Sequence, residues 1–211
     1  MRCTKKIVAL LLAVAVILGV AGCAKAKPLT KDNLIAELES YGVKENDKVD
    51  VLLSSMMRRG GVDNDYYVAK NEADAKELSN YVVDKFDERS DFDATDFVLT
   101  VVCEKGSDDR YYYTFLVYIS FDDTKEAKKA YKDIVDAYGD EEDGKTGTKS
   151  NTTYCIDACV SAAGYNKIGT GVYLQGNQVI FLRADSAVKD KFKFADTICG
   201  NLGLPALPKA K

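Results

Sequence analysis

The stretch "YYYTFLVYISF", residues 111–121, carries the clearest structural signal in the chain. Its alternate residues form one continuously apolar face, and side chains on a β-strand alternate between the two faces. That face consists of Tyr111, Tyr113, Phe115, Val117, Ile119 and Phe121. The stretch therefore predicts a long strand whose apolar face lies in the core of a sheet.

The opposite face of this strand mixes aromatic, aliphatic and hydroxyl side chains. It consists of Tyr112, Thr114, Leu116, Tyr118 and Ser120. Two interpretations stay open. An exposed face of this kind stacks on a sugar or receives a peptide, whereas a second layer of helices or strands makes it part of the core. Tyr112, Leu116 and Tyr118 are the candidate binding residues, and their exposure decides between the two.

A pattern of strand, helix and strands occurs twice around this stretch. The strands of the first copy are "DYYVAK", residues 65–70, and "DFVLTVVCEKG", residues 96–106; those of the second are residues 111–121 and "NTTYCIDACVSAAGY", residues 151–165. The intervening helices match at an offset of 52 residues: Ala75-Lys76, Val82-Val83-Asp84 and Phe86 against Ala127-Lys128, Ile134-Val135-Asp136 and Tyr138. Tandem repeats of this kind predict an α+β fold, a mainly antiparallel sheet with helices packed on it.

Residues 29–61 predict a pair of helices before the sheet. Thr30 stands where a first helix begins, and Gly42 stands where it ends. A second stripe of apolar residues runs from Val49 to Met57 at helical spacing. We expect this segment to form one compact domain with the repeated α+β region, residues 62–211.

The second half of the chain gives further local signals. Asp123 and Glu126 have the spacing of a capping box at a helix start. The polar segment "DEEDGKTGTKS", residues 140–150, predicts a solvated loop. Gly176-Asn177 predicts the turn of a hairpin, and residues 187–202 predict a closing helix that buries Val188 and Cys199.

The first residues have the order of a secretory signal, a basic start followed by twelve apolar residues from Ile7 to Leu18. That run is shorter than the roughly 20 apolar residues that a membrane span needs. The next segment, "VAGC" at residues 20–23, resembles the lipobox of bacterial lipoproteins, which implies acylation of Cys23. Residues 1–22 are then the signal peptide and 23–28 a tether with a reach of roughly 20 Å. We expect a domain held at the outer face of the cell membrane by its lipid anchor.

Composition excludes several classes of function. Without residues 1–22 the chain has 26 basic and 33 acidic residues, a net charge of −7, and it has no histidine. Nucleic acid is therefore not an expected partner, because phosphate binding needs a basic face. The commonest general base and metal ligand are both missing, so the sequence offers no zinc hydrolase and no Ser-His-Asp triad. It predicts no catalytic residue, no metal site and no cofactor.

Four cysteines remain in the folded part: Cys103, Cys155, Cys159 and Cys199. They are candidates for disulfides or for buried thiols. On one strand Cys155 and Cys159 lie about 13 Å apart, too far to pair with each other. They share a face with Asp157, and the three with Cys103 form a weaker candidate for a soft metal.

The order of elements, ending in "NLGLP" at residues 201–205, is similar to that of small surface lipoproteins of low-GC Gram-positive bacteria. This resemblance implies a surface location and an α+β fold, and it brings no catalytic residues. The function predicted is a lipid-anchored extracytoplasmic module that binds an envelope ligand, a glycan or a protein. The alternative is an envelope enzyme or thiol/redox protein that uses cysteine or carboxylate chemistry.

Overall fold

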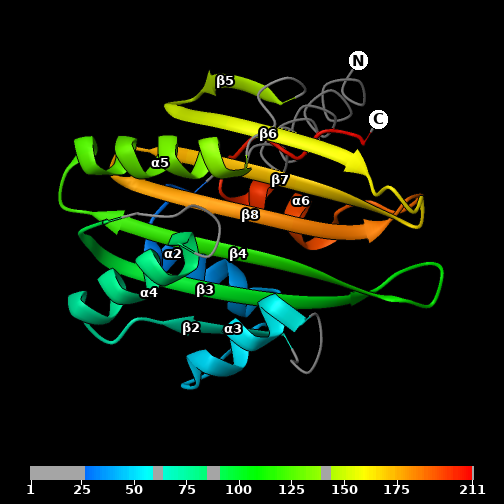
Figure 1. Ribbon diagram of the computed structural model, residues 1–211, viewed down its shortest axis with the longest axis horizontal. Coiled ribbons are helices and arrows are strands. Elements are labelled where there is room, and N and C mark those ends of the chain that lie inside the picture. The colour runs from blue at the N-terminus through cyan, green and yellow to red at the C-terminus, as the bar shows by residue number, and fades with distance from the viewer. Residues whose placement is uncertain (1–26, 59–63, 85–90, 139–143, 211) are drawn as a thin grey trace, which may run out of the picture.

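The computed structural model describes residues 27–58, 64–84, 91–138 and 144–210, which form five helices and one eight-stranded sheet (Figure 1). The predicted α+β fold with a mainly antiparallel sheet is confirmed. The signal segment and the lipobox with Cys23 lie outside the described residues. Among the described helices, none combines the length and the apolar character of a membrane span.

The sheet has the order β1-β2-β3-β4-β8-β7-β6-β5. Only β1 and β2 run parallel, and all other neighbours are antiparallel. The strands are β1 (Lys44–Glu45), β2 (Asp65–Val68), β3 (Ala94–Lys105), β4 (Tyr111–Phe121), β5 (Lys145–Lys149), β6 (Thr152–Val160), β7 (Asn166–Gln175) and β8 (Gln178–Ala187). The predicted long strand at residues 111–121 is β4, and it lies in the middle of the sheet.

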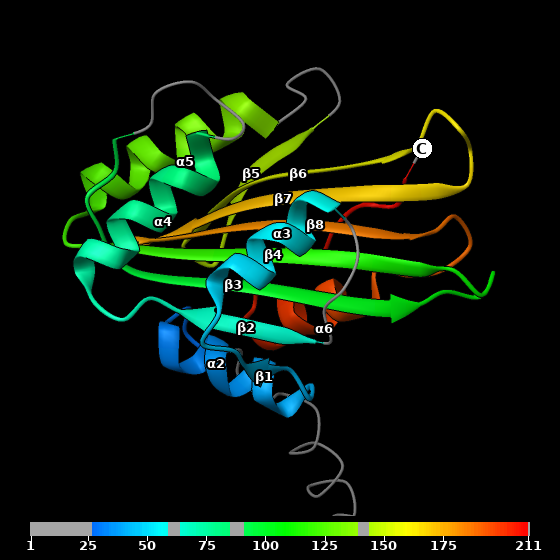
Figure 2. The same ribbon diagram turned by 60° about the horizontal axis from the view of Figure 1, so that its bottom comes forward.

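Helices cover both faces of the sheet (Figure 2). On one face lie α3 (Val49–Arg58), α4 (Glu72–Asp84) and α5 (Thr124–Tyr138), and on the other lie α2 (Lys31–Ser40) and α6 (Lys193–Asn201). Two hydrophobic cores result, one on each side of the sheet. Strand β4 contributes alternate side chains to both cores, because Phe115 and Val117 pack in the first core and Leu116 and Tyr118 pack in the second.

The two-sided cover settles the role of two candidate binding residues. Leu116 is 0% exposed and Tyr118 is 2% exposed, because α2 and α6 pack over that face of β4. The interpretation of these two as part of an open aromatic surface is therefore wrong, and they are core residues. Tyr112, the third candidate, is only half-buried and lies beyond the end of this core.

Helix and turn signals in the sequence are confirmed at several places. The Thr30 side chain accepts a hydrogen bond from the Asn33 backbone N–H (3.2 Å), and Gly42 ends that helix segment with a φ of 89°. Asp123 caps α5 by accepting a hydrogen bond from the Glu126 N–H at 2.9 Å. Gly176 takes a φ of 62° in the two-residue turn between β7 and β8, a conformation that glycine adopts without steric cost.

The tandem repeat is not confirmed. In the first copy the strands on either side of α4, β2 and β3, are hydrogen-bonded neighbours. In the second copy β8 and β7 lie between the two strands of the copy, β4 and β6. The sequence similarity therefore reflects two amphipathic helices of the same kind and not two copies of one strand-helix-strand unit. Phe86 of the first copy lies outside the described residues.

Two other expectations are corrected. Residues 145–149, expected in a loop, form the edge strand β5, because they pair antiparallel with β6. The closing helix begins at Lys193 and not at residue 187, because β8 continues to Ala187 and a turn follows it. Val188 therefore lies in this turn and is 41% exposed, whereas Cys199 is buried as expected.

Glu37 joins the start of the described chain to both helices of the second face. This buried carboxylate in α2 pairs with the Lys27 ammonium at 2.7 Å and accepts a hydrogen bond from Asn201 Nδ2 at 2.6 Å. The Lys27 backbone N–H also donates to the Asn201 carbonyl at 3.1 Å. The N-terminal segment is thus fixed at the C-terminal end of α6.

Candidate functional site

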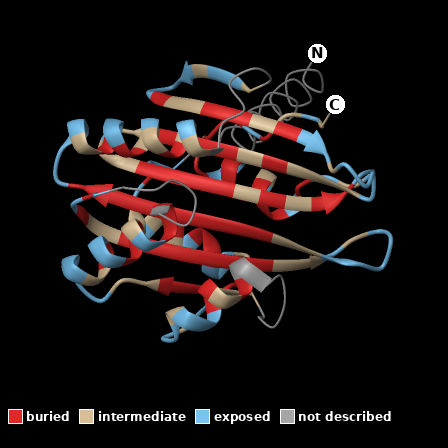
Figure 3. Cartoon of the chain, in the orientation of Figure 1, coloured by how far each residue is buried: buried red, intermediate tan, exposed pale blue. Residues whose placement is uncertain are grey.

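Strand β4 leaves the core at its first three residues. From Thr114 to Phe121 every residue is buried, whereas Tyr112 and Tyr113 are half-buried and Tyr111 is 65% exposed (Figure 3). The helices do not extend to this end of the β3–β4 hairpin, so aromatic side chains stay at the surface there. The expectation that Tyr111 belongs to the buried face is corrected for this reason.

Three loops meet at this end of the sheet: the β3–β4 turn, the β6–β7 turn and the β8–α6 connection. The Ser107 backbone N–H donates to Asp190 Oδ2 at 2.8 Å, which ties the first loop to the third. The Arg110 guanidinium lies 5.0 Å from the centre of the Tyr165 ring, which ties the first loop to the second. Tyr165 is itself 64% exposed.

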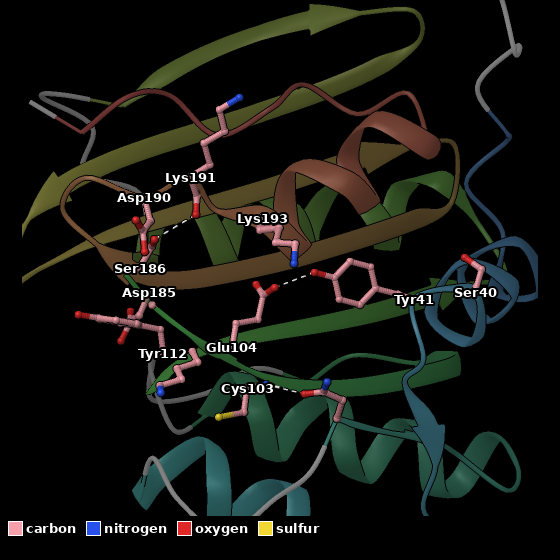
Figure 4. A pocket seen from close by; sticks show the side chains of 13 residues that line it. Ser40, Tyr41, Cys103, Glu104, Tyr112, Asp185, Ser186, Asp190, Lys191 and Lys193 are labelled. Carbon is pink, nitrogen blue, oxygen red and sulfur yellow. Dashed lines mark hydrogen bonds between the residues drawn. The ribbon is translucent and has the colours of Figure 1, made fainter. Parts of the chain in front are cut away.

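An open pocket of about 780 Å³, here called the main pocket, lies on the α6 side of this end (Figure 4). Strands β3, β4 and β8 form its floor, and α2 and the start of α6 form its sides. It is lined by Ser40, Tyr41, Asn64, Cys103, Glu104, Lys105, Gly106, Tyr112, Asp185, Ser186, Asp190, Lys191 and Lys193. Its volume falls within the range of about 300–1,000 Å³ that small-molecule sites have.

Glu104 holds the two helices that flank the main pocket. Its Oε1 accepts a hydrogen bond from the Tyr41 hydroxyl at 2.7 Å, and its Oε2 accepts one from the Phe194 backbone N–H at 3.1 Å. The Tyr41 and Phe194 rings pack edge to face with centres 5.0 Å apart. Since the N-cap residue of α6, Phe192, makes no side-chain cap, Glu104 supplies the acceptor that the helix start lacks.

Two smaller pockets continue the main pocket around the hairpin. A second pocket of about 560 Å³ shares Asn64 and Cys103 with it and is also lined by Gly42, Lys44, Asp65, Tyr111 and Tyr113. A third of about 200 Å³ shares Tyr112 and Asp185 with it and is also lined by Arg110, Tyr111, Tyr113, Tyr165 and Asn166. We call the lining of all three pockets the loop-end surface.

Hydrogen bonds hold several polar groups of this surface in place. The Tyr112 hydroxyl donates to Asp108 Oδ2 at 2.6 Å. Burial and this hydrogen bond raise the pKa of Tyr112 to about 12, so the phenol stays neutral at physiological pH. Hydrogen bonding to Ser107 lowers the pKa of Asp190, which therefore stays ionised. Lys191 and Lys193 are exposed at the rim of the main pocket.

The cysteines do not come together. None of the four forms a disulfide with another described residue: Cys155 and Cys199 are buried, Cys103 is half-buried and Cys159 is exposed. Cys103 on β3 is four strand positions from β6, which carries Cys155 and Cys159; this separation is about 19 Å. Neither a disulfide nor a shared metal site joins Cys103 to those two residues.

The described part of the chain holds no group of three or more cysteine and acidic side chains placed for a metal ion. Burial raises the pKa of the Cys199 thiol to about 12, so this cysteine is not a thiolate near neutral pH. Cys103 is the one of the four that lines the main pocket, where its backbone N–H donates to Asn64 Oδ1 at 2.8 Å. The arrangement favours binding through rings and hydrogen bonds.

Of the three candidate binding residues from the sequence, only Tyr112 lines the site. The sequence reasoning missed Arg110, Tyr111, Tyr113 and Tyr165 at the site. A signal was available, because "DDRYYY" at residues 108–113 places three consecutive tyrosines directly after a polar turn. Tyr165 gives no such signal, since only the fold brings its loop beside Arg110.

The fold and the site define an α+β protein with one two-sided sheet and a tyrosine-rich surface at its loop end. No family model matches the chain, and no curated protein sequence matches it significantly. Among solved structures, the chain is similar to the extracellular domain of PknH from Mycobacterium tuberculosis. The match has a TM-score of 0.41 and 11% identity over 85% of this chain and 99% of that one. This similarity is too low to carry an inference, so the site is interpreted from this chain's residues alone.

Proposed function

We propose that this protein is a lipid-anchored extracytoplasmic module that binds an envelope ligand or partner at the loop-end surface. The observation that carries the proposal is the main pocket of about 780 Å³, where β4 emerges from the core and Tyr112 becomes accessible. Tyrosine supplies both a ring and a hydroxyl at a binding surface. The loops around the pocket are held to one another, so a ligand meets a surface that is already ordered.

The anchor is supported by the signal pattern and by "VAGC" at residues 20–23. If Cys23 is acylated, four residues lead from it to Lys27, a reach of about 14 Å. Lys27 is fixed at the C-terminal end of α6, and this nine-residue helix spans about 13 Å to Lys193 at the pocket. The main pocket then stays within roughly 30 Å of the bilayer surface, so its ligand must be present near the membrane.

Hydrogen exchange of the full chain with and without soluble fragments of envelope glycan and of secreted proteins tests the binding site. We expect added protection in residues 105–113 and 161–166, where the loop-end surface lies. The proposal is contradicted if the added protection is confined to α4 and α5, or if no glycan fragment and no secreted protein adds protection.

Acylation is tested separately in a bacterial host. The wild-type chain should partition into detergent and carry the mass of the added acyl groups on Cys23. The variant Cys23→Ser should lose both properties, whereas Cys159→Ser, which removes an exposed cysteine, should keep them. A wild-type chain that stays in the aqueous phase with its signal intact contradicts the anchor.

A thiol function is the second candidate, favoured by the exposure of Cys159 and by the position of Cys103 at the main pocket. It predicts that at least one of these thiols reacts rapidly with an alkylating reagent in the native chain. If Cys103 and Cys159 both resist alkylation under native conditions, the thiol function is excluded.

A further inference from the structure

We infer that the ligand of the loop-end surface is an uncharged oligosaccharide, stacked on Tyr111 and Tyr165. The inference rests on the proposed function, because it names the class of ligand for the same site. Four features carry it: exposed rings, a lining without aliphatic side chains, balanced charge, and loops that are fixed before binding.

The first feature is the exposure of two tyrosine rings. Tyr111 is 65% exposed and Tyr165 is 64% exposed, and both line the third pocket with Tyr112 and Tyr113. Scattered exposed aromatic residues need no explanation, but here four tyrosines line one small pocket. Tyr111 and Tyr113 lie on one face of β4, Tyr112 lies on the other, and Tyr165 comes from the β6–β7 turn. A flat ring packs against the face of a pyranose, where the C–H groups point, while the phenol hydroxyl serves the hydroxyls at the sugar's edge.

The second feature is what the lining lacks. Among the described residues that line the three pockets there is no valine, leucine, isoleucine, methionine or phenylalanine. Small apolar ligands and the apolar anchors of protein partners need pockets lined by such side chains. The loop-end surface offers rings surrounded by amide, carboxylate, hydroxyl and ammonium groups. These groups match a ligand that carries many hydroxyls and little continuous apolar surface.

The third feature is the balance of charge. The lining has five basic side chains, Lys44, Lys105, Arg110, Lys191 and Lys193, and four acidic ones, Asp65, Glu104, Asp185 and Asp190. Several are already engaged: Lys105 pairs with Asp109 at 2.7 Å, and Glu104 accepts two hydrogen bonds. Clefts of one sign of charge attract ligands of the opposite sign. This surface has no dominant sign, so it fits a neutral sugar better than an acidic polymer.

The fourth feature is the fixed geometry of the loops. Ser107 is bonded to Asp190, Arg110 lies over the Tyr165 ring, and the Gly106 N–H donates to the Arg110 carbonyl at 2.8 Å. The positions of Tyr111 and Tyr165 are therefore set relative to each other before a ligand arrives. Binding then costs less ordering of loops, which matters for a ligand that gains little from each contact.

Calorimetric titration of the full chain in detergent with chitotetraose, cellotetraose and maltotetraose tests the inference. At least one of these neutral probes should bind, and Tyr111→Ala with Tyr165→Ala should weaken its affinity by about tenfold or more. Tyr111→Phe, which keeps the ring, should stay within about threefold of wild type. Tyr81→Ala on α4 is the matched control, because Tyr81 is an exposed tyrosine outside the site, and it should leave affinity unchanged.

Two outcomes overturn the inference: no neutral tetrasaccharide binds at millimolar concentration, or the double variant binds as tightly as wild type. A peptide array of secreted proteins, probed in parallel, separates this failure from failure of the proposed function. If the wild type binds peptides but no sugar, and the double variant loses the peptide binding, the saccharide inference is overturned and the proposed binding site stands. Absence of both kinds of binding overturns both proposals.

Discussion

Replacement of Glu104 by alanine should destabilise the protein and loosen the main pocket. The carboxylate accepts one hydrogen bond from the Tyr41 hydroxyl at 2.7 Å and one from the Phe194 N–H at 3.1 Å. Hydrogen bonds to a charged group contribute about 1.5–3 kcal/mol each. Because Glu104 is only half-buried, water replaces part of this loss, and we expect the free energy of unfolding to fall by about 2–3 kcal/mol.

Related variants measure how much each hydrogen bond of Glu104 contributes to this loss of stability. Glu104→Gln keeps one acceptor oxygen and should cost about 1 kcal/mol. Tyr41→Phe removes one donor, keeps the ring packed on Phe194, and should cost about the same. If the hydroxyl and the carboxylate act on each other, the double variant should cost less than the sum of the two single ones. Glu77→Ala, at an exposed position of α4, is the control and should change stability by less than about 0.5 kcal/mol.

Urea unfolding of the full chain, followed by far-ultraviolet circular dichroism, measures these differences. A fall in the midpoint at constant slope reports lost stability without a change in the denatured state. If Glu104→Ala unfolds within about 0.5 kcal/mol of the wild type, Glu104 does not hold α2 and α6 in place, and the account of the pocket walls is wrong.

Three other outcomes follow from the structure. Leu116→Ala should cost about 2–5 kcal/mol in a urea titration and leave ligand binding unchanged, because this side chain is 0% exposed in the core. The hydrogen bond and ion pair with Lys27 lower the pKa of Glu37 below its usual 4.5. The stabilisation by ionised Glu37 should therefore be complete above about pH 4.5 and be lost as the pH falls through the lowered pKa. The melting temperatures of Glu37→Gln and wild type should accordingly converge in acid. Alkylation with mass spectrometry should modify Cys159 in the native chain and modify Cys155 and Cys199 only after unfolding.

Local signals in the sequence predicted most of the elements. The alternation in residues 111–121 specified β4, and Thr30, Gly42, Asp123 and Gly176 specified caps and turns through hydrogen bonds or dihedral angles that act within a few residues. The edge strand β5 was not predicted because it depends on pairing with another strand and not on a local signal. Its sequence "KTGTK" is polar throughout, and only pairing with β6 makes it a strand.

The site was only partly predictable, because burial depends on where neighbouring elements end. A period of two determines which residues of β4 share a face, but the helices that cover it come from elsewhere in the chain. Tyr118 and Tyr112 look equivalent in the sequence, yet α2 and α6 bury the first and leave the second at a pocket.

The sequence by itself thus determined the α+β class, the central strand and the signals at the ends of helices, because these follow from side-chain period and local hydrogen bonding. The tertiary structure alone decided the strand order, the two-sided cover of the sheet and the meeting of three loops around the tyrosines. Those features arise from contacts between residues far apart in the chain, such as Arg110 with Tyr165 and Ser107 with Asp190. No local pattern encodes such pairs, since each partner is an ordinary surface residue until the fold places it.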